Sequence, residues 1–145
     1  MRKVLTLPYT KKLGIHQSDR KGFLLQMNDA IQNQNHINTF HASASYSLAE
    51  TSSGYFLEKN FSEIADQTIP VLRTATIKYK RAATGTLYSS AKLVDDNIAS
   101  VNQVLLAKKK VLVTIQVKLF NEEKELVLTG NFEWFVILPA LALKP

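Results

Sequence analysis

The stretch HASASYSLAETSSGYFLEK, residues 41–59, decides the fold. It predicts a helix over residues 41–57, with Asn38 and Thr39 as candidates for the N-cap and Gly54 near the C-terminal end. Because eight of its residues are Ala or Ser, strands could approach this helix closely from several sides. We therefore expect a sheet that wraps the helix, although a helix that is simply well packed would have the same composition.

Five segments around this helix have strand-like patterns. Residues 22–30 form the first, and residues 67–82 alternate, with Val71, Arg73, Ala75, Ile77 and Tyr79 on one side. We expect 67–82 to pair with 86–94 as a hairpin, and 111–120 to pair with 125–138 as a second hairpin around the turn NEEK. Residues 95–110 predict a short helix that begins at two capping aspartates, Asp95 and Asp96, and ends in lysines. The fold class is α+β, with one long helix and a mostly antiparallel sheet.

Length and composition favour one domain, residues 1–145, with a core over about 22–138 and residues 1–21 on the surface. The absence of cysteine excludes disulfides and cysteine-ligated metal sites. The longest apolar run, FVILPALAL, is too short to span a membrane and is interrupted by Pro139. We therefore expect a cytoplasmic protein with no membrane partner.

The chain carries a net charge of +6, which attracts polyanions. A solvated basic surface is the simplest interpretation, and a ligand that carries phosphates would fit the same charge. No zinc finger, helix-turn-helix or aromatic-basic strand motif supports nucleic acid as the partner. A basic nucleic-acid-binding module is kept as an alternative because of the charge alone.

The start of the helix is the best candidate for chemistry. His36 and His41 have no third ligand at a recognised spacing, so we expect no metal and no cofactor. The first-turn N–H groups of a helix lack partners within the helix, and there they could polarise a carbonyl oxygen. The small residues Ala42 and Ser43 leave this position open, and Asn35 and His41 could supply further donors.

Glu50 is the candidate general base. Its neighbours at helical spacing are small or polar, without Lys or Arg, so a partly buried Glu50 would have a raised pKa. An exposed glutamate on an amphipathic helix is the alternative. Glu50 lies nine residues after His41, roughly 13 Å along the helix at 1.5 Å per residue. If both groups act on one small reacting group, two subunits must supply them across a dimer interface.

The motif NHINTFHASASYSLAE, residues 35–50, resembles the entry to the central helix of hotdog-fold thioesterases of the phenylacetate-degradation type. The resemblance extends over about residues 22–138, through TATIKYKRAATGTLYSSAKL and the closing hairpin. It implies a hotdog fold, in which a curved antiparallel sheet wraps one long central helix. Asn38 replaces the usual Gly of the family, Ala42 and Ser43 replace its Gly-Gly, and Glu50 replaces its more frequent Asp.

The resemblance also implies an activity. Proteins of this family hydrolyse acyl-CoA thioesters as homodimers, some of which pair into dimers of dimers. It implies that Glu50, His41 and Asn35 serve catalysis, and that Asn38, Ala42 and Ser43 bind substrate together with Tyr46, Lys80 and Arg81. Lys80 and Arg81, or Lys108–Lys110, would contact the CoA phosphates. The acyl chain would run between the helix and the partner subunit, where Tyr46 and Tyr55 would either line it or belong to the core. A hotdog protein that binds acyl-CoA without catalysis is the second interpretation.

Overall fold

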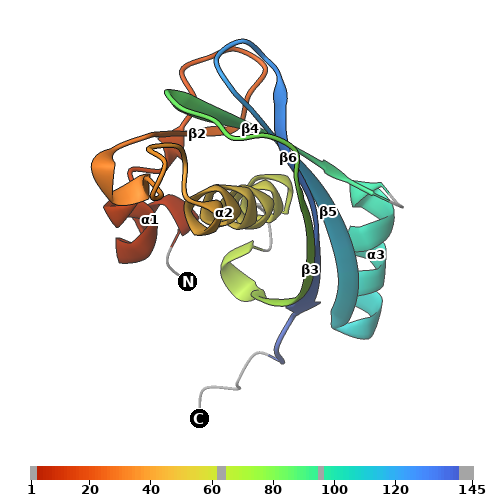
Figure 1. Cartoon of the computed structure of the whole chain (residues 1–145). Helices are drawn as coiled ribbons and strands as arrows, with labels where there is room; N and C mark the ends of the chain where they lie inside the picture. The colour runs from red at the N-terminus through yellow and green to blue at the C-terminus, as the bar shows by residue number, and fades with distance from the viewer. Residues whose placement is uncertain (1–2, 62–64, 95–96, 141–145) are drawn as a thin grey trace.

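A curved antiparallel sheet and one long helix, α2, form the centre of the molecule (Figure 1). The computed structural model describes residues 3–61, 65–94 and 97–140. Within these ranges the sheet has six strands in the order β1-β2-β4-β5-β6-β3. The strands are β1 (His16–Gln17), β2 (Leu25–Asn28), β3 (Ile69–Tyr79), β4 (Thr86–Leu93), β5 (Lys110–Phe120) and β6 (Leu126–Ile137). This confirms the predicted α+β fold with a sheet wrapped around a central helix.

The pairing of the strands differs in part from the prediction. β5 and β6 form the expected hairpin around residues 121–125. The predicted hairpin of β3 with β4 is wrong, because β3 pairs with β6 while β4 lies between β2 and β5. β3 therefore lies at one edge of the sheet, with one row of its backbone groups unpaired in the described chain.

A β-bulge in β3 changes which side chains face the helix. The register with β6 shifts between Leu72 and Thr74, at Arg73. Leu72 lies opposite Trp134, whereas after the shift Ala75 lies opposite Phe132. The predicted alternation is therefore right for the second half of β3 and wrong for Val71 and Arg73, because a bulge reverses the faces.

The central helix α2 (Ala42–Asn60) packs against the concave face of the sheet (Figure 1). Its small polar residues are buried and hydrogen-bonded, as the close approach of the strands requires. The Ser52 hydroxyl, which is fully buried, lies 2.7 Å from the Leu48 carbonyl and 2.7 Å from the Ser89 hydroxyl of β4. The helix ends at Asn60, three residues beyond the predicted end at residue 57.

Five shorter helices in the described chain lie around these central elements. They are η1 (Val4–Thr6), α1 (Pro8–Lys12), η2 (Ile31–Asn33), η3 (Ala65–Gln67) and α3 (Ile98–Lys108). Asn97 caps α3 by accepting a hydrogen bond from the Ser100 N–H at 2.9 Å, whereas the predicted caps Asp95 and Asp96 lie outside the described residues. None of the helices in the described ranges has both the length and the apolar character that a membrane span needs.

Candidate functional site

The His41 side chain caps the start of α2. Its Nδ1 accepts a hydrogen bond from the Ser43 N–H at 3.0 Å, and its carbonyl accepts from the N–H groups of Ala44 and Ser45, both at 3.0 Å. The predicted caps Asn38 and Thr39 therefore lie three and two residues before the actual cap. Within the described residues, no acceptor lies in hydrogen-bond reach of the Ala42 N–H. One first-turn donor is thus left for a ligand.

The loop before this helix is held by the Asn35 side chain. Its Oδ1 accepts from the N–H groups of Ile37 (3.0 Å) and Thr39 (3.1 Å), and its Nδ2 donates to the Thr39 hydroxyl (2.9 Å) and the Phe40 carbonyl (3.3 Å). Asn35 is therefore occupied within its own loop. Asn38 has φ 58, a left-handed conformation that Asn tolerates better than most residues. This explains why Asn can stand where the resembled family has Gly.

Glu50 lies in the middle of α2 and is half-buried. Burial raises the pKa of its carboxyl above the ordinary glutamate value. In the described part of the chain, its carboxylate makes neither a hydrogen bond nor an ion pair. A carboxylate that is poorly solvated and unpaired is a stronger base than one in water, so Glu50 has the environment of a general base.

Tyr46 lies one helical turn before Glu50. Burial raises the pKa of its hydroxyl, and the nearby charges of Glu50 and Tyr79 raise it further. Its ring packs against Phe132 with 5.9 Å between the centroids. The Tyr79 hydroxyl donates to the Ala42 carbonyl at 3.3 Å, which connects the edge strand β3 to the start of the helix.

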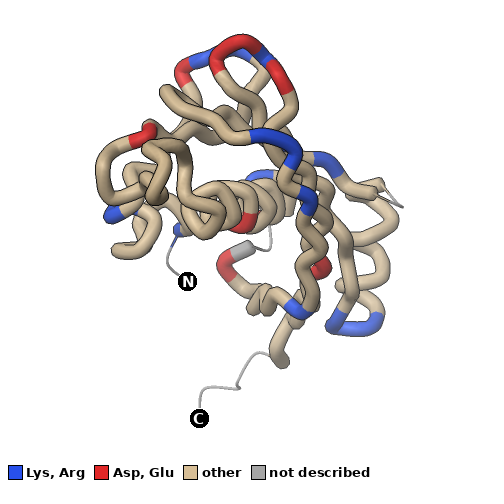
Figure 2. Tube along the Cα trace, in the orientation of Figure 1, with Lys and Arg blue, Asp and Glu red and all other residues tan. Residues whose placement is uncertain are grey.

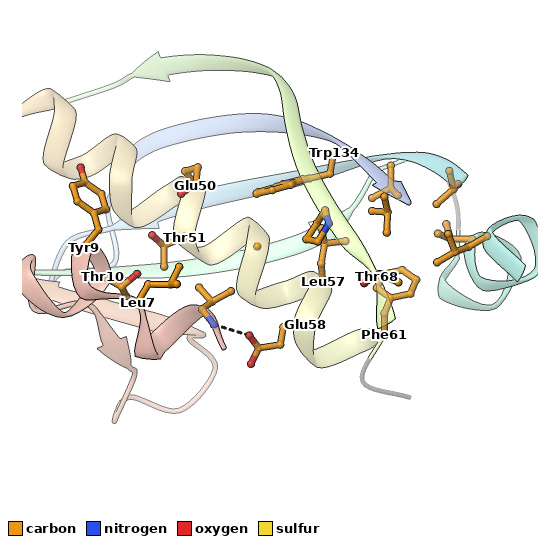
Figure 3. A pocket seen from close by; sticks show the side chains of 18 residues that line it. Leu7, Tyr9, Thr10, Glu50, Thr51, Leu57, Glu58, Phe61, Thr68 and Trp134 are labelled. Carbon is orange, nitrogen blue, oxygen red and sulfur yellow. Dashed lines mark hydrogen bonds between the residues drawn. The ribbon is translucent and has the colours of Figure 1, made fainter. Parts of the chain in front are cut away.

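A cavity of about 320 Å³ opens beside Glu50 (Figure 3). It lies between the N-terminal segment (residues 4–10), α2, α3 and the ends of β3, β5 and β6. In Figure 3, Tyr9 and Glu50 lie toward one end of the cavity, Phe61 and Thr68 lie toward the other, and Trp134 stands between them. The cavity therefore leads from the candidate base into the interior of the fold.

Two hydrogen bonds fix the N-terminal segment over this cavity. The Val4 N–H donates to Glu58 Oε2 at 2.8 Å, shown as the dashed line in Figure 3. The hydroxyl groups of Tyr9 and Ser47 lie 2.9 Å apart. No sequence pattern indicates this wall, because the segment has no periodicity and joins α2 only through tertiary contacts.

The structure brings some of the predicted site residues together and separates others. Glu50 lines the cavity, whereas Ala42 and Ser43 lie two turns earlier at the exposed start of the helix. Neither Tyr46 nor Tyr55 is part of the cavity wall, and Tyr55 is a core residue with 8% exposure. Trp134 of β6 was missed as a wall residue, because its partner Ser53 lies 81 positions away in the sequence.

The predicted phosphate contacts lie on the surface. Arg81 forms an ion pair with Glu125 at 2.7 Å, while Lys80 is exposed. The Asn121 amide and then Arg81 lower the pKa of Glu125. Lys108–Lys110 form a second basic group at the turn from α3 to β5, well separated from the first (Figure 2). Among the described residues, no three His, Asp or Glu lie close enough together to hold a metal ion.

Comparison with models of protein families identifies the family of this chain. A family model described as a domain of unknown function (DUF4442) matches residues 4–136. The chain belongs to the DUF4442 family. No curated protein sequence matches this DUF4442 protein.

Solved structures establish its fold. A Pseudomonas aeruginosa protein described as a probable thioesterase is 20% identical with a TM-score of 0.74, covering 92% of this chain and 90% of that one. The E. coli PaaI protein from the phenylacetic acid degradation operon is 18% identical with a TM-score of 0.66, covering 93% and 86%. A Bacillus halodurans protein, solved with CoA, is 18% identical with a TM-score of 0.66, covering 86% and 72%. The predicted hotdog fold is confirmed.

Proposed function

We propose that this DUF4442 protein hydrolyses acyl-CoA thioesters, with Glu50 as the general base or nucleophile. One observation carries the proposal, namely a half-buried carboxylate with a raised pKa that stands unpaired beside an apolar cavity. A charged group without a partner costs folding free energy, so its presence on the central helix favours a role in chemistry over one in stability.

The reaction follows from the position of this base. The Glu50 carboxylate takes a proton from water, and the water oxygen attacks the carbonyl carbon of the thioester. Helix N–H groups hold the oxyanion that forms. The C–S bond then breaks, the CoA sulfur takes the proton from Glu50, and a carboxylic acid and free CoA thiol leave. If Glu50 acts as the nucleophile instead, its carboxylate attacks the thioester carbonyl, the C–S bond breaks and the CoA thiolate leaves. Water then hydrolyses the resulting anhydride, which restores the Glu50 carboxylate, releases the carboxylic acid and supplies the proton that the thiolate takes up.

In this proposal, the oxyanion donor is the Ala42 N–H of the partner's helix in a homodimer. Within one chain, Ala42 and Glu50 are eight residues apart, roughly 12 Å along the helix, too far to act on one carbonyl. The edge strand β3 supports the dimer, since its unpaired backbone edge could pair with a second copy. Ile69 and Val71 on β3 are 49% and 48% exposed, so pairing with a second copy would remove apolar surface from water.

The remaining predicted residues take supporting roles in the proposal. Asn35 positions the loop, and His41 presents Nε2–H to the ligand, because its Nδ1 accepts from Ser43. Lys80 is the better candidate for the CoA phosphates, since Arg81 is already paired with Glu125. The CoA in the Bacillus halodurans structure supports this ligand class.

A binding function without catalysis is the second candidate, and one observation favours it. The His41 ring occupies the Ser43 N–H, so the start of the helix offers fewer free donors than an oxyanion site with two N–H groups. Such a protein would hold acyl-CoA without cleaving it.

A panel of acyl-CoA thioesters of increasing length tests the proposal, with free thiol release as the measurement. We expect turnover of at least one member. Thermal stabilisation by acyl-CoA with no thiol release from any member would support the binding function and overturn hydrolysis. Neither turnover nor stabilisation would overturn both.

A further inference from the structure

The cavity beside Glu50 lies within one subunit, so it is a site in its own right and does not depend on a partner chain. The N-terminal segment forms one wall, α2 forms another, and Val113, Trp134 and Val136 of the sheet form the floor. α3 covers the inner part through Val101 and Leu105. The family resemblance gave no reason to expect this chamber, since the predicted path of an acyl chain ran between the helix and the partner subunit.

The walls suit a ligand without charge. Glu50 and Glu58 are the charged groups among the described lining residues, and Glu58 already accepts the Val4 N–H. The Trp134 Nε1–H already donates a hydrogen bond to the Ser53 hydroxyl at 2.9 Å, so the indole presents only its apolar surface to the cavity. Most of the remaining wall is aliphatic or aromatic. A hydrocarbon chain would satisfy this surface, whereas a polar chain would leave its groups unpaired.

Gly54 keeps the middle of the cavity open. A Cβ built at this position would lie 3.6 Å from the Trp134 ring, an ordinary contact, so packing does not demand glycine here. Glycine within a helix costs roughly 1 kcal/mol relative to alanine. The missing side chain leaves a passage between Glu50, one turn before it, and Leu57, nearly one turn after it.

The volume limits the length of the ligand. Taking about 30 Å³ for each water-sized group, a cavity of about 320 Å³ accommodates a chain of roughly ten carbons.

We infer that this cavity binds the acyl chain of the substrate and that this chain is linear, apolar and of medium length. Gly54 sets the maximum length of the chain that fits. The inference rests on the proposed function for the identity of the substrate, but the chamber can be tested without catalysis. Trp134 is the single tryptophan of the sequence and lines the cavity, so its fluorescence reports occupancy.

The test titrates linear 1-alkanols from butanol to dodecanol while Trp134 fluorescence is followed. Each methylene should tighten binding roughly fourfold until the chain fills the cavity near ten carbons. In Gly54→Leu, whose four side-chain carbons take the place of about four methylenes, decanol should bind roughly 200-fold more weakly. Gly54→Ala, which suits the helix better, should weaken it about fourfold. Phe56→Leu, on the same helix but outside the cavity, serves as the matched control and should bind decanol as the wild type does.

Parallel thiol-release assays separate this inference from the proposed function. Turnover of acyl-CoA that does not depend on chain length, together with Trp134 fluorescence that alkanols do not change, would refute acyl-chain binding in the cavity. The proposal of hydrolysis would be unaffected. Decanol binding that Gly54→Leu blocks, without turnover of any thioester, would support the chamber and overturn hydrolysis. Alkanol binding that is equal in wild type and both Gly54 variants would also refute acyl-chain binding in the cavity.

Discussion

Glu50→Gln should leave the fold intact, increase its stability and abolish most turnover. Gln is nearly isosteric with Glu, and no cation in the described chain loses a partner by the change. A general base contributes about 10²–10⁴-fold to the rate, which corresponds to roughly 2.7–5.4 kcal/mol of transition-state free energy at 1.36 kcal/mol per tenfold. The loss should appear in kcat, because the change leaves the cavity and the start of the helix as they are.

The pH dependence gives the same prediction a second measure. The folded protein holds the Glu50 proton more tightly than the unfolded chain does, because burial raises the pKa of this carboxyl. The stabilising effect of protonation is complete below the ordinary glutamate pKa and is lost as the pH rises through the raised value. Glu50→Gln has no such loss, so it should become the more stable form over that window and remain so at neutral pH.

The midpoint of the pH–rate profile and the change in unfolding free energy must report the same rise in the pKa of Glu50. Wild-type turnover requires the carboxylate, so the rate should rise with pH around the raised pKa. For each pH unit by which this midpoint exceeds the ordinary glutamate value, Glu50→Gln should gain about 1.4 kcal/mol of unfolding free energy at high pH. Urea unfolding across the pH range and pH–rate profiles supply the two numbers.

Two variants control for the removal of a charge as such. Glu58→Gln, on the same helix, weakens the hydrogen bond from the Val4 N–H and should destabilise the protein, the opposite sign to Glu50→Gln. Glu133→Gln alters a half-buried glutamate on the other face of β6 and should keep wild-type turnover. A Glu50→Gln protein that is less stable than wild type at neutral pH, or that turns over thioester at the wild-type rate, would refute the reasoning.

Three further variants test other parts of the structure. Ala42→Pro removes the free first-turn N–H at a position where proline fits, because His41 has φ −62 and ψ 138. The fold should persist while kcat falls about 10²–10³-fold. A kcat equal to that of the wild type would count against the oxyanion role. Ser53→Ala leaves the buried Trp134 Nε1–H without its acceptor, and urea unfolding should show a loss of about 1–3 kcal/mol, reduced slightly by the better helix propensity. Gly130→Ala places a Cβ 2.7 Å from the nearest side-chain atom, so thermal melting should show a loss of about 1–3 kcal/mol, and an unchanged melting temperature would contradict this packing.

The sequence predicted the central helix and the closing hairpin because both depend on local signals. The polar loop and the small residues at 41–45 mark the helix start, and β5 and β6 alternate on either side of a short turn. The predicted end at residue 57 falls three residues short of Asn60, because tertiary packing of the buried Leu57 and Phe61 carries the helix further than local signals indicate.

Pairing between distant segments could not be predicted from alternation. Alternation shows which residues of a strand share a face, but not which strand lies beside it. β3 and β4 are neighbours in sequence, yet β3 pairs with β6, and the bulge at Arg73 leaves no clear mark in the pattern. The cavity was missed for a related reason, since its walls come from segments as distant as residues 4 and 136. The unpaired, half-buried environment of Glu50, in contrast, follows from its neighbours at helical spacing, and its role in chemistry stays a proposal.

Mixing two inactive variants tests the central claim most directly, because the proposed site takes Glu50 from one subunit and the Ala42 N–H from the other. Glu50→Gln homodimers lack the base at both sites, and Ala42→Pro homodimers lack the donor at both. After unfolding and refolding as an equal mixture, half of the dimers should be mixed, and each mixed dimer has one intact site out of two. The account predicts that the mixture regains about a quarter of wild-type thiol release. A mixture that contains mixed dimers, shown by differently tagged subunits, but releases no more thiol than either variant alone would contradict the account.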